Sequence, residues 1–177
     1  NKRCISIKEC KTKEGFLALT YEEIIDLLDT YMNKIGEHRD LSRNFIEEIK
    51  KVFRTKSCIG FDITKSLLLE LDYDEVYFVN KNKMRNYKIL FKNSVKTEFL
   101  DVDFSSGTED RKIDLKDKEL FVQNVSLKDK IIIKDYSSKI SRLFIDWKMP
   151  LFLRKIWPGI YDTNGKLLYV PRYRKNF

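Results

Sequence analysis

The sequence predicts an α+β protein in which a small helical-hairpin domain with short strands precedes a β-rich C-terminal domain carrying one or two helices. Three observations predict this class. Apolar residues recur at helical spacing between residues 20 and 53. Short runs rich in Leu, Val, Tyr and Phe follow from residue 60 onward, which is typical of strands. The 177 residues are 42% hydrophobic and 35% charged, a composition that suits a folded chain with a buried core.

The first predicted helix begins at Thr20 and ends at Gly36. Thr20 and Glu23 have the spacing of a capping box, in which each side chain accepts a hydrogen bond from the other residue's backbone N–H. A second helix is predicted from about residues 40–42 to Phe53, because apolar residues again fall on one face. Since the link between them is short, we expect these helices to pair as a hairpin.

Strands are predicted in two groups. The first group covers 60–63, 66–71 and 75–79, and the second covers 87–91, 95–104, 120–125 and 130–134. The polar turn at 80–83 separates the groups, so we expect one domain over 1–84 and another over 85–177. A last helix, capped by Ser137 or Ser138, carries an apolar stripe at Ile140, Leu143, Phe144 and Trp147, and a short helical turn follows over 151–157. Asn164-Gly165 is typical of a hairpin turn.

Positive charge is concentrated in two segments. The chain carries 35 Lys and Arg against 27 Asp and Glu. Residues 81–97 hold 6 basic and no acidic residues, and residues 139–177 hold 9 basic and 2 acidic ones. Clustered positive charge is typical of proteins that bind a polyanion such as nucleic acid. The alternative is a lysine-rich surface that only keeps the protein in solution.

Signals of an enzyme site are weak. The one histidine, His38, lies in the link between the first two helices, where a solvated side chain is the better interpretation. No His, Cys and carboxylate cluster has metal-ligand spacing, and the six glycines are scattered. We therefore predict no catalytic residue and no metal site. A cation site at Asp101 and Asp103 is the alternative. The three carboxylates at Asp72, Asp74 and Glu75 are expected in a solvated turn.

Cysteine and membrane signals are equally sparse. Cys4, Cys10 and Cys58 form no disulfide framework, which favours a reducing cytosol. No apolar run approaches the ~20 residues that a membrane span needs, so no membrane partner is predicted.

The C-terminal segment interleaves cations with aromatic rings. Phe144 and Trp147 are expected in the core, whereas the cations off their stripe need solvent or a partner. Alternation along a strand over 167–174 would put Arg172 and Arg174 on one face, as a phosphate clamp, and Tyr173 on the other. The predicted nucleic-acid-binding residues are Lys139, Arg142, Lys148, Arg154, Lys155, Arg172, Arg174 and Lys175. Residues 81–96 are a weaker second patch.

The C-terminal segment contains a series of short motifs in a fixed order along the chain. A basic helix leads to a Lys148-Met149-Pro150 step, then to Arg154, Trp157-Pro158, the turn at Asn164-Gly165 and a closing strand to Val170. In this order the segment resembles the C-terminal domain of bacterial tRNA(Ile)-lysidine synthetases. Residues 16–80 resemble the preceding domain of the same enzymes, whereas 81–124 match neither. The chain departs from the family pattern at residues 128–131, which lack a usual Gly-Asp, and at Pro171, where a Gly is common.

The resemblance implies a role in tRNA modification. Such ligases activate the wobble cytidine of the isoleucine tRNA that has a CAU anticodon, hydrolysing ATP to AMP, and join lysine to it. ATP and Mg²⁺ bind an N-terminal domain with a Ser-Gly-Gly-x-Asp-Ser loop, and this motif is absent here. The sequence opens on Asn1 without a Met, so we expect the C-terminal portion of a longer cytoplasmic protein. By itself it would hold the acceptor stem, bind no cofactor and catalyse nothing.

A second interpretation belongs to another class. The chain would be a basic protein-interaction or scaffolding module without an RNA role. Its basic strand would dock on an acidic partner or on a sister subunit, and the sequence leaves a homodimer open. Salt-sensitive RNA affinity would favour the first interpretation, and stable self-association without it the second.

Overall fold

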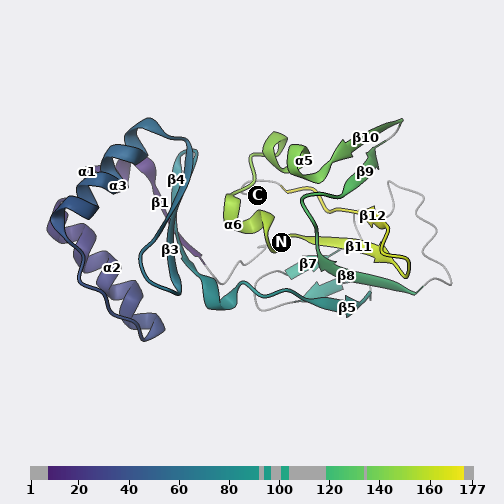
Figure 1. Cartoon of the computed structure of the whole chain (residues 1–177), viewed down its shortest axis with the longest axis horizontal. Coiled ribbons are helices and arrows are strands. Elements are labelled where there is room, and N and C mark those ends of the chain that lie inside the picture. Colours follow the sequence, from purple (N-terminus) through teal and green to yellow (C-terminus); the bar gives the residue numbers. More distant parts are fainter. Residues whose placement is uncertain (1–7, 92–93, 97–100, 104–118, 134, 174–177) are drawn as a thin grey trace. The chain divides into compact units, whose positions relative to one another are not determined.

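Figure 1 shows a computed structural model of the chain, which describes residues 8–91, 94–96, 101–103, 119–133 and 135–173. The chain divides into two compact units between Lys83 and Met84. We call the described residues up to Lys83 the N-terminal unit and those from Met84 the C-terminal unit, and describe each by itself. The first is rich in helices and the second in antiparallel strands, so the predicted α+β class is confirmed.

The N-terminal unit contains a four-stranded antiparallel sheet in the order β1-β4-β3-β2. Its strands are β1 (Lys8–Thr12), β2 (Cys58–Asp62), β3 (Leu67–Asp72) and β4 (Glu75–Asn80), and the short 3-10 helix η1 (Lys81–Lys83) follows. The strands β2 to β4 follow the predicted runs. Strand β1 was not predicted, and it lies at the edge of the sheet beside β4.

Three helices lie along the chain between β1 and β2, namely α1 (Lys13–Ala18), α2 (Tyr21–Ile35) and α3 (Arg43–Thr55). The predicted capping box of α2 is present, because the Glu23 N–H donates to the Thr20 hydroxyl at 3.2 Å and the Thr20 N–H to the Glu23 carboxylate at 2.7 Å. Gly36 ends α2 at φ 73°, a left-handed conformation that glycine adopts without steric cost. Ser42 caps α3 by accepting from the Phe45 N–H.

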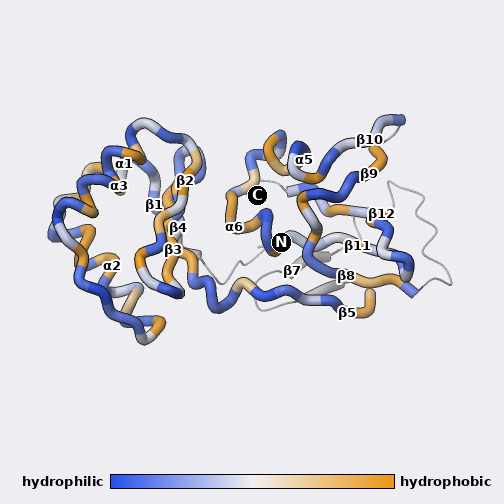
Figure 2. The backbone as a smooth tube through the Cα atoms, viewed as in Figure 1, coloured by the Kyte–Doolittle hydropathy of each residue, from blue (hydrophilic) through white to orange (hydrophobic). Residues whose placement is uncertain are grey.

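The helices pack on one face of this sheet (Figure 1). Alternate residues of β3, Leu67, Leu69 and Leu71, are buried in one core with the apolar faces of the helices. In Figure 2 apolar residues recur along α2 and α3 among hydrophilic ones, as an amphipathic helix requires. Tyr31 of α2 stacks on Phe78 of β4 with ring centroids 4.3 Å apart, so the two layers interlock.

The C-terminal unit is built on a second antiparallel sheet, in the order β12-β11-β8-β5. Its strands are β5 (Lys88–Leu90), β8 (Leu120–Asn124), β11 (Pro158–Asp162) and β12 (Leu167–Tyr169). Two further pairs are antiparallel, β6 (Ser94–Lys96) with β7 (Asp101–Asp103), and β9 (Lys130–Ile133) with β10 (Tyr136–Lys139). The predicted turn joins β11 to β12, with Gly165 at φ 77° and the Asp162 carboxylate accepting from the Asn164 N–H.

Two short helices follow β10, α5 (Ile140–Asp146) and α6 (Leu151–Arg154). Ile140 and Phe144 of the predicted apolar stripe are buried, whereas Leu143 and Trp147 are half-buried, so the expected core position of Trp147 is confirmed only in part. The predicted serine cap is wrong, because Ser137 and Ser138 belong to strand β10 and Lys139 precedes the helix without a side-chain cap. The backbone of these serines is used in the ladder with β9, which outweighs their local preference for a helix start.

Candidate nucleic-acid interface

The structure describes most of the predicted binding residues, and these lie at the surface. Five of them are exposed, namely Lys139, Arg142, Lys148, Lys155 and Arg172. Arg154 is half-buried, and Arg174 and Lys175 lie outside the described residues. Among residues 119–133 and 135–173, 9 side chains are basic and 5 acidic. The C-terminal unit therefore offers an excess of exposed cations.

Two of the arginines already contact groups of the same unit. The Arg142 guanidinium lies 3.2 Å from the Asp146 carboxylate, one helical turn away on α5. Both side chains are exposed, and such a pair contributes only about 0.3–0.5 kcal/mol, so it does not prevent Arg142 from binding a phosphate. The Arg154 Nε donates to the Met149 carbonyl at 2.8 Å, which closes the turn around α6. Arg154 therefore serves the fold with at least one of its donors.

Asn124 joins the two basic segments of the sequence. Its side-chain NH₂ donates to the carbonyl oxygens of Lys155 at 3.1 Å and of Arg85 at 3.4 Å. Its carbonyl oxygen accepts from the Tyr87 N–H at 2.8 Å. Asn124 therefore brings the backbones of Arg85 and Lys155, one residue from each basic segment, close together, and both residues are exposed.

Tyr87 reinforces this junction. Its hydroxyl donates to the Ile156 carbonyl at 2.9 Å, and burial raises its pKa, so the group stays a neutral donor. Sequence reasoning missed Asn124. The signal that could have found it is the amide pair Gln123-Asn124 near the end of the otherwise apolar strand over 120–125.

Arg172 lies between Pro171 and Tyr173, which both contact Trp157. Strand β12 ends at Tyr169, so the strand predicted over 167–174 is shorter than expected. The alternation still holds locally, because Tyr173 is buried and Arg172 is exposed. The Arg172–Arg174 clamp stays a prediction, since Arg174 lies outside the described residues.

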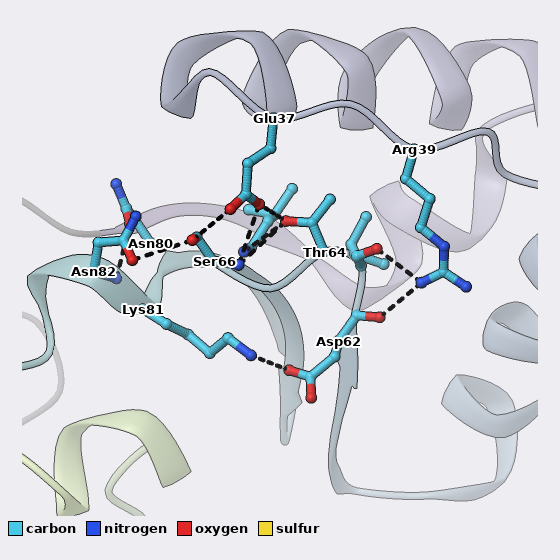
Figure 3. Close-up of polar contacts among 10 residues, drawn as sticks. Glu37, Arg39, Asp62, Thr64, Ser66, Asn80, Lys81 and Asn82 are labelled. Atoms are coloured by element: carbon cyan, nitrogen blue, oxygen red, sulfur yellow. Dashed lines mark hydrogen bonds and ion pairs between the residues drawn. The ribbon is translucent and has the colours of Figure 1, made fainter.

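The N-terminal unit contains a separate polar network (Figure 3). Glu37 accepts hydrogen bonds from the hydroxyls of Thr64 and Ser66, and from the Ser66 N–H at 3.2 Å. These bonds to Ser66 and Thr64 hold the pKa of the Glu37 carboxyl below its ordinary value. Arg39 donates to the carbonyls of Asp62 and Ile63. The network ties the link after α2 to the turn between β2 and β3, which is a structural role.

The other candidates from the sequence add no reactive group. His38 is exposed and lies 3.2 Å from the Asp40 carboxylate, as expected for a solvated loop residue. Asp72 differs from the expected solvated turn, since only 2% of its surface is exposed. The side chains of Asp101 and Asp103 lie outside the described part of the chain. Among the residues that are described, no group of three or more His, Cys, Asp or Glu could hold a metal.

Comparisons with known proteins add no family. No protein-family model matches the sequence, and no curated protein is significantly similar to it. Over the described residues, no helix is long and apolar enough to cross a membrane. The candidate site thus consists of exposed cations on a strand-rich unit, and such cations can contact phosphate groups.

Proposed function

We propose that this chain is the tRNA-binding portion of a tRNA(Ile)-lysidine synthetase and that its C-terminal unit binds the acceptor stem. The motif order over 139–177 suggests the family. The observation that carries the proposal is the junction at Asn124, which brings together the backbones of Arg85 and Lys155, one residue from each basic segment. Ligation of lysine with ATP and Mg²⁺ would belong to a catalytic domain outside this chain, in the cytoplasm.

The chemistry of an acceptor stem supports this assignment. The stem is A-form RNA, whose deep major groove side chains cannot read, so proteins recognise it through phosphates, 2′-hydroxyls and shape. Exposed Lys and Arg side chains supply these contacts, and each phosphate neutralised releases counterions. Arg172 and Lys155 are exposed and suit this role.

A binding assay across a salt series tests the proposal. The ligands are the isoleucine tRNA with a CAU anticodon and a bare acceptor-stem hairpin. We expect comparable affinities for both, with a log–log salt slope of about −0.9 per phosphate neutralised. Arg172→Ala combined with Arg174→Ala should weaken binding without unfolding the protein. Absence of binding to either RNA would contradict the proposal.

One observation favours the second candidate, a protein-interaction module. Leu90 of the edge strand β5 is 51% exposed, and Ile145 of α5 is 48% exposed. An edge strand can pair with another protein through its backbone, and exposed apolar side chains can add contact area to such an interface. Concentration-dependent self-association with no salt-sensitive RNA affinity would favour this second candidate over tRNA binding.

A further inference from the structure

Hairpin β9–β10 presents one of its faces entirely to solvent. Residues directly opposite each other in an antiparallel pair project from the same face. Lys130 is paired with Lys139, and Ile132 with Ser137. All four are exposed, Ile132 by 67%. We call these four residues the outer face of the hairpin.

The opposite face fixes the hairpin to the rest of the C-terminal unit. Ile131 is buried on that side. At the base of the hairpin the Tyr161 hydroxyl donates to the Asp129 carboxylate at 2.7 Å, and the Ile140 N–H donates to the Asp129 carbonyl at 2.9 Å. Burial and the neighbouring Asp129 raise the pKa of Tyr161, so its hydroxyl remains a donor. The outer face therefore belongs to a hairpin whose other side is fixed to the rest of the C-terminal unit.

The pairing of Lys130 with Lys139 is unfavourable within the chain itself. Like charges directly opposite each other in a ladder repel, at a Cβ separation of roughly 5 Å. Among the described residues neither ammonium group makes an ion pair or a hydrogen bond. No acidic residue shares the outer face. An anion placed between the two ammonium groups would turn this repulsion into attraction.

We propose that the outer face binds the sugar–phosphate backbone of RNA, with Lys130 and Lys139 contacting phosphate oxygens and Ile132, which lies two residues further along β9, packing on an adjacent ribose. This inference rests on the proposed function and extends it to Lys130 and Ile132, which the sequence did not single out. Lysine binds phosphate as a point charge and needs no bidentate geometry. Two flexible lysines on one ladder rung can thus follow a backbone without reading its sequence.

The size and composition of the outer face favour RNA over a protein. A stable protein interface covers ~800 Å² per partner and has a core enriched in aromatic residues. The outer face has four residues on two short strands, and none of them is aromatic. Phosphate contacts need only cations at a suitable spacing.

The test measures tRNA binding and thermal unfolding on the same variants. The variants are Lys130→Gln, Lys139→Gln and their combination. The control is Lys166→Gln, which removes an exposed lysine from the β11–β12 turn. Each hairpin substitution should reduce the magnitude of the salt slope by about 0.9 and the affinity by roughly eightfold at 0.1 M salt, since one phosphate contact is lost. The control should leave slope and affinity unchanged.

A charge reversal separates binding from folding. Lys130→Glu replaces a repulsive cross-strand pair with an attractive one, so it should raise the unfolding temperature while it weakens tRNA binding. Ile132→Thr keeps a β-branched residue and should weaken binding with an unchanged salt slope, because no charge is removed.

Two results would overturn the inference, and they differ from each other. If the unmodified chain binds tRNA but the double variant keeps its affinity and slope, or changes no more than Lys166→Gln, the outer face has no role and the proposed function stands. If the unmodified chain binds no tRNA at any salt concentration, the proposed function fails together with the inference.

Discussion

The indole N–H of Trp157 donates a hydrogen bond to the carbonyl oxygen of Pro171 at 2.8 Å. Trp157 is 2% exposed, and the ring of Tyr173 packs against its ring edge-on, with centroids 5.6 Å apart. Arg172 lies between these two contacts along the chain. Trp157 therefore fixes the backbone before and after Arg172, which is itself exposed.

Trp157→Phe should loosen this segment. The substitution removes the donor to Pro171 and leaves part of the indole volume unfilled, which should cost about 1–3 kcal/mol of unfolding free energy. Urea unfolding followed by circular dichroism measures the change. The control is Trp147→Phe at the half-exposed end of the α5 stripe, which should cost less. Equal losses from both substitutions would show that the Trp157 contacts have no special weight.

Gly159→Ala should destabilise the C-terminal unit for a steric reason. A Cβ atom at Gly159 would lie 2.5 Å from the Val125 Cγ2 atom and 2.9 Å from the Leu167 Cδ1 atom, and all three residues are buried. Overpacking of this kind costs typically 1–3 kcal/mol, roughly the range expected in thermal or urea unfolding. Adding Val125→Ala should restore part of the loss, because it removes the closest clashing atom.

A second glycine provides a contrast with a different cause. Gly165 has φ 77° and nothing near its Cα that a Cβ atom would meet. Gly165→Ala should therefore cost only the backbone strain of about 1 kcal/mol, and Val125→Ala should not relieve it. Rescue of Gly165→Ala by the same valine substitution would refute the steric explanation for Gly159.

Glu37→Gln should destabilise the N-terminal unit in a pH-dependent way. The pKa of Glu37 is lowered from its ordinary value of 4.5 because the carboxylate accepts hydrogen bonds from Ser66 and Thr64. A lowered pKa in the folded state means that the ionised group adds stability above pH 4.5, and that this stability is lost as the pH falls through the folded-state pKa.

Urea unfolding at a series of pH values follows this loss. The difference between the unmodified protein and Glu37→Gln should be largest near neutral pH and should shrink below pH 4.5, where Glu37 itself becomes protonated. Glu48→Gln on the exposed face of α3 is the control and should show little effect at any pH. A difference that stays constant down to pH 3 would contradict the assigned role of the carboxylate.

Features with a local cause could be predicted from the sequence. The capping box of Thr20, the start of the second helix at about residues 40–42 and the Asn164-Gly165 turn depend on neighbours a few residues away, and each is present. Strand β1 depends on its pairing with β4, about 70 residues later, so the local sequence did not reveal it. Ser137 and Ser138 show the opposite case. Their local sequence predicted a helix cap, but their pairing with β9 places them in a strand.

The candidate site was predicted in composition but not in arrangement. Charge counting located the cations of the two basic segments. It could not show that one amide, Asn124, contacts the backbone of both Arg85 and Lys155, because this contact depends on the folded sheet. The strand predicted over 130–134 contains Lys130, but the sequence did not indicate which strand pairs with it. The cross-strand pair of Lys130 and Lys139 follows only from the register of the hairpin.

The junction at Asn124 predicts that Arg85 and Lys155 act on the same RNA. Arg85→Ala and Lys155→Ala should each weaken tRNA binding and reduce the magnitude of the log–log salt slope by about 0.9, because each removes one phosphate contact. Both residues are exposed, so the unfolding temperature should stay within the range of ordinary surface substitutions. Lys51→Ala, an exposed cation on α3 of the other unit, is the matched control. A loss with Lys51→Ala as large as that with Lys155→Ala would mean that net charge alone governs binding. A loss confined to Arg85 and Lys155 would place the RNA at the residues around Asn124.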